Sequence, residues 1–325
     1  MKVLSGISGY EVNEANFEAL RLALNYMGEN YGAGYFHGIA GTAFRIGGIC
    51  PCAPTCTLAM QPQQLIRLFG YDYDECPYDD ADRDASLCKL TDAVRGSVDS
   101  GTPVLVWNAF TNCEWDLVTG YDENEKVFFG RGSYMGNGGE YAKSPWNRSL
   151  EQAGLVGLTA LTLKRGTGVF DRRSAETAAV KEAVRHANDS ENTEKLGGSE
   201  WVFLQGKAAY KRWAYDFSKP DRARGLGDAY CIGIYSSCHA LAGKFLRGIA
   251  PSYPNASGTL AEASQLFDRE AGCLKQLMPL LGWNSPEKDE RRNEKAAVLL
   301  KEAAGYYGNA IDLLSAAVTE MQQEQ

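Results

Sequence analysis

The amino-acid composition changes near Gly166-Thr167-Gly168, and this change divides the 325-residue chain into two halves with different local patterns. The first half has helical patterns followed by segments rich in Val, Leu, Thr and aromatic residues, which are typical of strands. The second half is rich in Ala, Glu, Lys and Arg, and its apolar residues recur at helical spacing. A single hydrophobic core seldom grows beyond about 250–300 residues. We therefore expect an α+β domain over residues 1–166 and an all-α helical bundle domain over residues 167–325.

The expected elements of the first half are helices first and an antiparallel sheet second. A helical apolar period predicts a helix over 11–27, with Asn13 as its N-cap and Gly28 at its end. Further helices are expected over 35–46, 61–69 and 84–98, and strands over 71–75, 103–107, 115–120, 126–129 and 155–163. In the second half, helices are expected over 172–187, 200–217, 228–246, 259–281 and 287–321.

Charge and hydropathy exclude several classes of partner. The net charge is −8 and the pI is about 5.1. Without a basic patch we expect no nucleic-acid partner, because such affinity depends on neutralising phosphates. No apolar run is long enough for a membrane span, and the N-terminus lacks the apolar core of a signal peptide. We expect a cytoplasmic protein whose nine cysteines are reduced thiols.

Three motifs in the first half resemble a known superfamily. The helix from Ala15 to Gly28 reads A-N-F-E-A-L-R-L-A-L-N-Y-M-G, and residues 114–122 read E-W-D-L-V-T-G-Y-D after G-T-P-V-L-V-W at 101–107. A third stretch, G-I-A-G-T-A-F-R-I at 38–46, precedes C-P-C-A-P-T at 50–55. The first two motifs resemble papain-like cysteine peptidases, in particular those that cleave bacteriocin leaders. The third is similar to bacterial proteins of undetermined function related to the N-terminal domain of the butirosin biosynthesis protein H family.

This resemblance implies a papain-like fold and places a catalytic pair at two positions of this chain. It puts the nucleophilic cysteine at Ala15, the catalytic histidine at Glu114 and the residue that orients the histidine near Arg131. Nucleophilic catalysis needs a thiolate and an adjacent base, which Ala15 and Glu114 do not supply. Our first hypothesis is therefore a pseudoenzyme that binds a small molecule or a peptide in a cleft between the two domains, without a cofactor.

The candidate ligand-binding residues surround positions 15 and 114. Glu114 and Asp116 share a face of the expected strand because side chains alternate along a strand. If this face lines the cleft, Glu114 could bind a cation, an amine or a peptide donor. A carboxylate partly buried beside another also has a raised pKa, which suits acid–base chemistry. A solvated strand end, or an ion pair between Glu114 and Arg131, is the alternative. The candidates are Asn13, Ala15, Asn16, His37, Glu114, Trp115, Asp116 and Arg131. For Asn13 simple capping, and for His37 a structural role, are the alternatives.

The cysteines offer a second hypothesis, an amide hydrolase or acyltransferase. It would use a displaced nucleophile, Cys50, Cys52 or Cys113, or carboxylate chemistry by Glu114. Cys113 precedes Glu114 directly, and a neighbouring carboxylate makes a thiol harder to ionise. Cys50, Cys52 and Cys56 are spaced C-x-C-x-x-x-C, which differs from the C-x-x-C pairs of common zinc sites. We expect ordinary thiols there rather than a metal site.

A third hypothesis concerns self-association. The segment 293–321 has apolar residues at helical spacing, including Leu300, Tyr307 and Leu314. Such a helix packs either within its own chain or across a homodimer.

Overall fold

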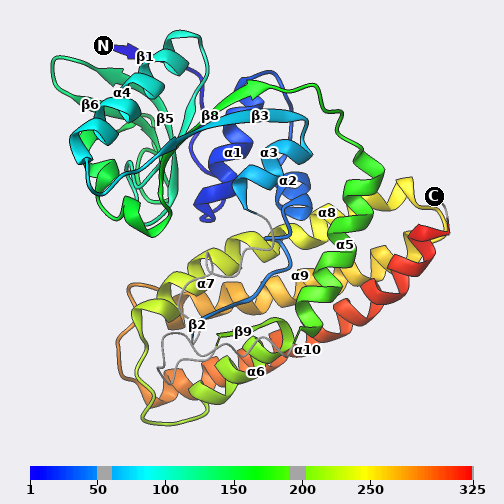
Figure 1. Ribbon diagram of the computed structural model, residues 1–325. Helices are drawn as coiled ribbons and strands as arrows, with labels where there is room; N and C mark the ends of the chain where they lie inside the picture. The colour runs from blue at the N-terminus through cyan, green and yellow to red at the C-terminus, as the bar shows by residue number, and fades with distance from the viewer. Residues whose placement is uncertain (50–60, 190–202, 324–325) are drawn as a thin grey trace. The chain divides into compact units, whose positions relative to one another are not determined.

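The computed structural model has an α+β fold and describes residues 1–49, 61–189 and 203–323 (Figure 1). The chain forms two compact units, one of Met1–Ala33 with Gln61–Phe170 and one of Gly34–Met60 with Asp171–Gln325. Within the described residues, no helix combines the length and the apolar character that crossing a membrane requires.

The first unit is built on an antiparallel sheet. Its strands are β1 (Lys2–Val3), β3 (Tyr71–Pro77), β4 (Val104–Trp107), β5 (Trp115–Asp122), β6 (Val127–Arg131), β7 (Ala142–Pro145) and β8 (Leu158–Arg165). Their order is β3-β8-β4-β5-β6-β7, and β1 pairs with β5. Strand β5 is buried along almost its whole length, because it also pairs with β4 and β6. The strands expected from residues 71 to 163 are confirmed within a few residues.

Helices pack on this sheet and hold the start of β5. They are α1 (Ala15–Tyr26), α3 (Pro62–Leu68), α4 (Arg83–Asp99) and the short 3-10 helices η2 (Trp146–Leu150) and η3 (Ala153–Leu155). Helix α1 packs on β4 and β5, whereas α4 packs on β3, β5 and β8. The N-cap of α1 is Glu14, whose carboxylate accepts a hydrogen bond from Phe17 N. The expected cap, Asn13, lies one residue earlier.

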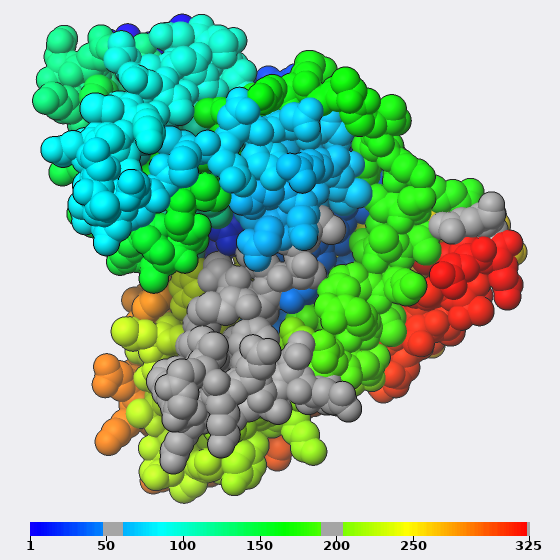
Figure 2. Space-filling view, in the orientation of Figure 1, coloured from blue at the N-terminus to red at the C-terminus, as the bar shows by residue number. Residues whose placement is uncertain are grey.

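The second unit is a helical bundle. Its helices are α2 (Ala33–Ile39), α5 (Arg172–Asn188), α6 (Gly206–Phe217), α7 (Leu226–Cys238), α8 (Ala242–Ile249), α9 (Ser257–Leu281) and α10 (Glu290–Gln322), and a 3-10 turn at His239–Leu241 separates α7 from α8. Helices α9 and α10 form an antiparallel hairpin, and α10 also packs on α5 and α6 (Figure 1). The C-terminal part of α10 reaches the molecular surface, where it is red in Figure 2.

The segment 34–49 differs from the expected domain boundaries because it packs with the second unit. The expected helix 35–46 ends at Ile39, and after a turn the chain enters β2 (Gly47–Ile49), which pairs with β9 (Phe203–Gln205). Tyr307 donates a hydrogen bond to Phe44 O at 2.9 Å, and His239 Nε2 lies 2.7 Å from Arg45 O. Buried backbone groups need such partners, so these polar side chains fix the segment among the helices.

Gly130 in β6 is a position without room for a side chain. A Cβ there would collide with the carbonyl oxygen of Leu117 and lie 2.7 Å from Phe110 Cε2. We expect Gly130→Ala to lower the free energy of unfolding by about 2–4 kcal/mol. Gly96→Ala is the matched control in α4, where a Cβ meets no atom within 4 Å, and it should raise stability by about 0.5–1 kcal/mol. Urea denaturation of both variants checks this, and equal stabilities would contradict the close approach at Gly130.

Candidate functional site

The start of α1 and the start of β5 are joined directly. Asn16 Oδ1 accepts a hydrogen bond from Trp115 N at 3.0 Å. Ala15 and Asn16 are only 1% and 4% exposed. Trp115 packs edge-to-face on Trp107, with ring centroids 5.6 Å apart. The positions that the sequence resemblance aligns with a catalytic pair therefore lie at one place in the first unit, inside its core.

Two acidic side chains at the start of β5, Glu114 and Asp116, are held by hydrogen bonds. Glu114, 1% exposed, accepts a hydrogen bond from Ser133 Oγ at 2.6 Å, and Asn13 O lies 3.4 Å from the same hydroxyl. Asp116, fully buried, accepts from Phe110 N at 2.6 Å and Thr111 N at 2.7 Å. Asp116 thus shapes the turn between β4 and β5. The expected proximity of Glu114 and Asp116 is present, but neither carboxylate faces solvent.

Burial shifts the protonation of these carboxyl groups. Burial, against the hydrogen bond from Phe17 N and together with the charge on Glu114, raises the pKa of Glu14 to about 8. Burial likewise raises the pKa of Asp116 to about 8, against its two backbone hydrogen bonds and with a contribution from Glu114. Within the described residues Glu14 Oε1 has no hydrogen-bond partner, whereas the Asp116 carboxyl also interacts with the Thr111 side chain. With pKa values of about 8, both carboxyl groups hold a proton at neutral pH.

Arg131 does not neutralise this acidic group. Its Nε and Nη2 donate to Ile7 O at 3.2 and 2.9 Å, and its Nη1 donates to the carbonyls of Gly138 at 3.2 Å and Glu140 at 3.0 Å. The guanidinium also stacks 4.0 Å from the Tyr141 ring centroid. Within the described residues Arg131 forms no ion pair, so the alternative of a Glu114–Arg131 pair is not what the structure shows. The role of Arg131 is to tie the N-terminal segment to the loop after β6.

The first unit contains no imidazole. All three histidines, His37, His186 and His239, belong to the second unit. His37 is fully buried there, with Nδ1 2.7 Å from Thr42 Oγ1. It is therefore not part of the group around Ala15 and Glu114. A thiol–imidazole pair within the first unit is excluded by its amino-acid content alone.

Of the candidate cysteines, only Cys113 lies within the residues that the structure describes. Burial and then the charge on Glu114 raise the pKa of Cys113, which opposes thiolate formation at neutral pH. Cys50, Cys52 and Cys56 lie outside the described residues. Across residues 1–49, 61–189 and 203–323, no three His, Cys, Asp or Glu side chains are placed to hold a metal ion.

An open hollow of about 510 Å³ lies beside α1 in the first unit. It is lined by Gly6, Ile7, Ser8, Glu11, Arg21, Leu22, Asn25, Tyr26, Asn30, Tyr31 and Gly32. Its volume is in the range of small-molecule sites, about 300–1,000 Å³. None of these residues was predicted from the sequence to bind a ligand. Four of them, Arg21, Leu22, Asn25 and Tyr26, lie in the helix motif of α1, and the others lie in irregular segments.

The charged side chains in and beside the hollow carry more negative than positive charge. Arg21 Nε and Nη2 donate to the fully buried carboxylate of Glu18 at 2.8 and 2.6 Å, and Nη2 also donates to Glu11 at 2.8 Å. Arg21 Nη1 donates to Tyr31 O at 3.1 Å. Glu18 compensates the arginine, whereas the Glu11 side chain is 61% exposed and adds a negative charge at the surface. The i, i+3 spacing of Glu18 and Arg21 on α1 is the sequence signal that predicts this ion pair.

No protein-family model matches the chain, and a search of curated proteins also finds no match.

Proposed function

We propose that the first unit is a papain-like domain without a cysteine mechanism, and that it binds a small organic cation non-covalently in the hollow beside α1. The order of helices followed by an antiparallel sheet, with α1 against β5, supports the papain-like assignment. The absence of histidine from this unit supports a role other than thiol catalysis. Free thiols at Cys76, Cys88 and Cys113 fit a reducing compartment such as the cytoplasm, which belongs to the proposal.

The observation that carries the proposal is the combination of a carboxylate and aromatic rings in one hollow. Glu11 supplies an exposed negative charge, and Tyr26 and Tyr31 supply aromatic surface. Ammonium groups are bound by such pairs of charge and ring face. An anionic ligand is disfavoured, because Arg21 is the only cation of the lining and its charge is already matched by Glu18.

The buried carboxylates around Glu114 act differently in this proposal. Ligand contact by Glu114, Trp115 or Asp116 would need these side chains to open to solvent, since they are 1%, 5% and 0% exposed. They instead hold α1 and the turn before β5 in place. Helix α1 both packs against these side chains and lines the hollow, so the shape of the hollow depends on how Glu114, Trp115 and Asp116 pack.

Calorimetric titration with choline and with its neutral isostere 3,3-dimethylbutan-1-ol tests the charge requirement. We expect choline to bind and the neutral alcohol to bind at least about tenfold more weakly, because a charge-assisted contact is worth about 1.5–3 kcal/mol. Glu11→Gln should weaken choline binding by a similar factor, whereas Glu151→Gln, an exposed glutamate outside the hollow, should not. Equal binding of the two compounds, or unchanged binding by Glu11→Gln, would overturn the proposal.

A further inference from the structure

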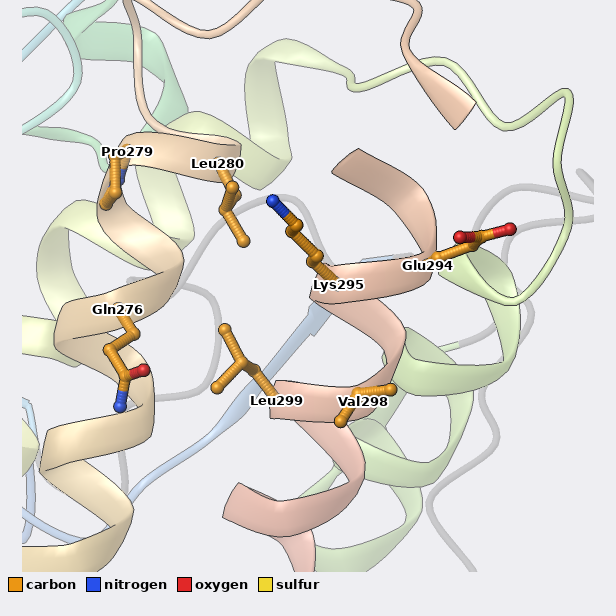
Figure 3. Close-up of a pocket in the computed structure, with 7 residues that line it drawn as sticks. All are labelled: Gln276, Pro279, Leu280, Glu294, Lys295, Val298 and Leu299. Atoms are coloured by element: carbon orange, nitrogen blue, oxygen red, sulfur yellow. The ribbon is translucent and has the colours of Figure 1, made fainter. Parts of the chain in front are cut away.

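A second hollow, of about 580 Å³, lies between α9 and α10 in the helical unit. Figure 3 shows Leu280 of α9 and Lys295 and Leu299 of α10 directed toward one another across it. The Lys295 side chain extends from α10 toward Leu280 in Figure 3, and its methylene groups can cover apolar surface while the ammonium group stays in water. The hollow is therefore an apolar groove between two helices with a charged edge, and it is independent of the site beside α1.

The face of α10 next to this groove is apolar in its middle and charged at both ends. Lys295, Val298, Leu299 and Glu302 follow one another at helical spacing and lie on one side of the helix. Val298 is 55% exposed, Leu299 is half-buried, and the two charged residues are exposed. Within the described residues, nothing in the chain covers Val298. Exposed apolar side chains that line a groove mark interaction surfaces.

The charges on this face match those of a second, antiparallel copy. A two-fold axis between Val298 and Leu299 places Lys295 of each copy opposite Glu302 of the other, and Val298 opposite Leu299. Each copy then contributes the same surface, as in closed symmetric dimers. A shift of the axis onto Val298 would instead oppose Lys295 to Lys301 and Glu294 to Glu302. Like charges penalise that arrangement, so the charge pattern favours the axis between Val298 and Leu299 over an axis on Val298.

We propose that this chain forms an antiparallel two-fold dimer through α10, in which Val298 and Leu299 of each copy close the α9–α10 groove of the other. With this axis, residues 290–307 of the two copies of α10 lie opposite one another, and at 1.5 Å per residue they form a helix-to-helix contact about 27 Å long. A helix from a different protein could fill the same groove, but it would not need the paired order of Lys295 and Glu302 on one face.

The test is sedimentation velocity over a concentration series on the full chain and on charge-reversal variants. Lys295→Glu turns two attractive contacts into two repulsive ones, because symmetry repeats each contact. We expect Lys295→Glu and Glu302→Lys each to weaken dimerisation by at least about tenfold. The double variant Lys295→Glu with Glu302→Lys should return to within about threefold of the wild type. These side chains are exposed, so circular dichroism should show unchanged helix content.

The rescue by the double variant separates this proposal from its competitors. A wild-type chain that sediments as a monomer at every concentration would overturn it. Single and double variants that weaken association equally would also overturn it, since a contact elsewhere would then be responsible. Retention of a different polypeptide on a monomeric chain, lost in Val298→Asp, would assign the groove to another protein.

Discussion

Asp116→Asn should stabilise the first unit at pH 8 and remove much of its dependence on pH. The carboxyl pKa of Asp116 is raised from its ordinary 3.8 to about 8 by burial. The folded state therefore holds a proton that the unfolded state releases. The contribution of this carboxyl group to the free energy of unfolding is fully present below the unfolded pKa. It is lost as the pH rises from about 4 through about 8. At about 1.4 kcal/mol per pH unit, the wild type should lose roughly 3–4 kcal/mol between pH 5 and pH 8 from this group.

The asparagine keeps the contacts and removes the charge. Its amide oxygen can accept the hydrogen bonds from Phe110 N and Thr111 N, and its NH₂ group takes the place of Oδ1. A Cβ at Gly132 would lie 2.5 Å from Thr111 Oγ1 and 2.6 Å from Asp116 Oδ1, so the hydroxyl and this oxygen share one small space. Thr111 Oγ1, which interacts with the Asp116 carboxyl, can accept a hydrogen bond from the new NH₂ group.

Urea denaturation at pH 5 and pH 8 measures the effect. Asp116→Asn should gain about 2–4 kcal/mol over the wild type at pH 8 and much less at pH 5. Asp92→Asn removes an exposed carboxylate from the same unit, and its profile should run parallel to that of the wild type. A destabilised Asp116→Asn at pH 8 would show that the carboxylate is ionised and needed in that form.

His239→Ala should destabilise the second unit by about 3–5 kcal/mol. His239 Nδ1 lies 2.7 Å from Glu270 Oε1, and both side chains are fully buried. His239→Ala removes the cationic partner of Glu270, which keeps the hydrogen bond that Tyr210 donates to it, and breaking a buried pair costs about this much. The loss also frees Arg45 O, which His239 Nε2 contacts at 2.7 Å, and leaves a cavity.

A double-mutant cycle with Glu270→Gln isolates the pair. If the pair is coupled, His239→Ala combined with Glu270→Gln should cost less than the sum of the single changes. Burial alone would lower the pKa of His239, but the charge and hydrogen bond of Glu270 raise it above 6.5. The contribution of the pair is therefore complete below pH 6.5 and is lost as the pH rises through the folded pKa. Additive single effects, measured by urea denaturation at pH 6, would contradict the coupling.

The spacing of apolar residues predicted most of the helices and strands. It failed where a segment packs against residues that are far away in the sequence. The long helices and the strands from Tyr71 to Arg165 follow from apolar spacing within each segment. The short strands β1 and β7 were not expected, because two to four residues carry little periodic signal. The placement of residues 34–49 could not be predicted either, since it depends on Tyr307 and His239 far along the chain.

Alternation along the strand predicted that Glu114 and Asp116 share a face, and the structure buries both side chains at the start of β5. The hydrogen bond between Asn16 and Trp115 was not predicted. Exposure depends on what covers both elements, and the pattern of a single strand does not contain that information. The hollow beside α1 was not predicted, because Tyr31 lies in an irregular segment and Glu11, expected at the start of a helix over 11–27, lies before the observed start of α1 at Ala15.

The path of residues 34–49 has a consequence for the order in which the protein is synthesised. Phe44 accepts its hydrogen bond from Tyr307, 263 residues later in the chain. During translation Phe44 emerges long before Tyr307 exists, and residues 61–170, which belong to the first unit, are made in between. The first unit can therefore complete its sheet while the segment 34–49 still lacks its native partners. The helical unit becomes complete only when α10, the last helix to be made, arrives to close over that segment.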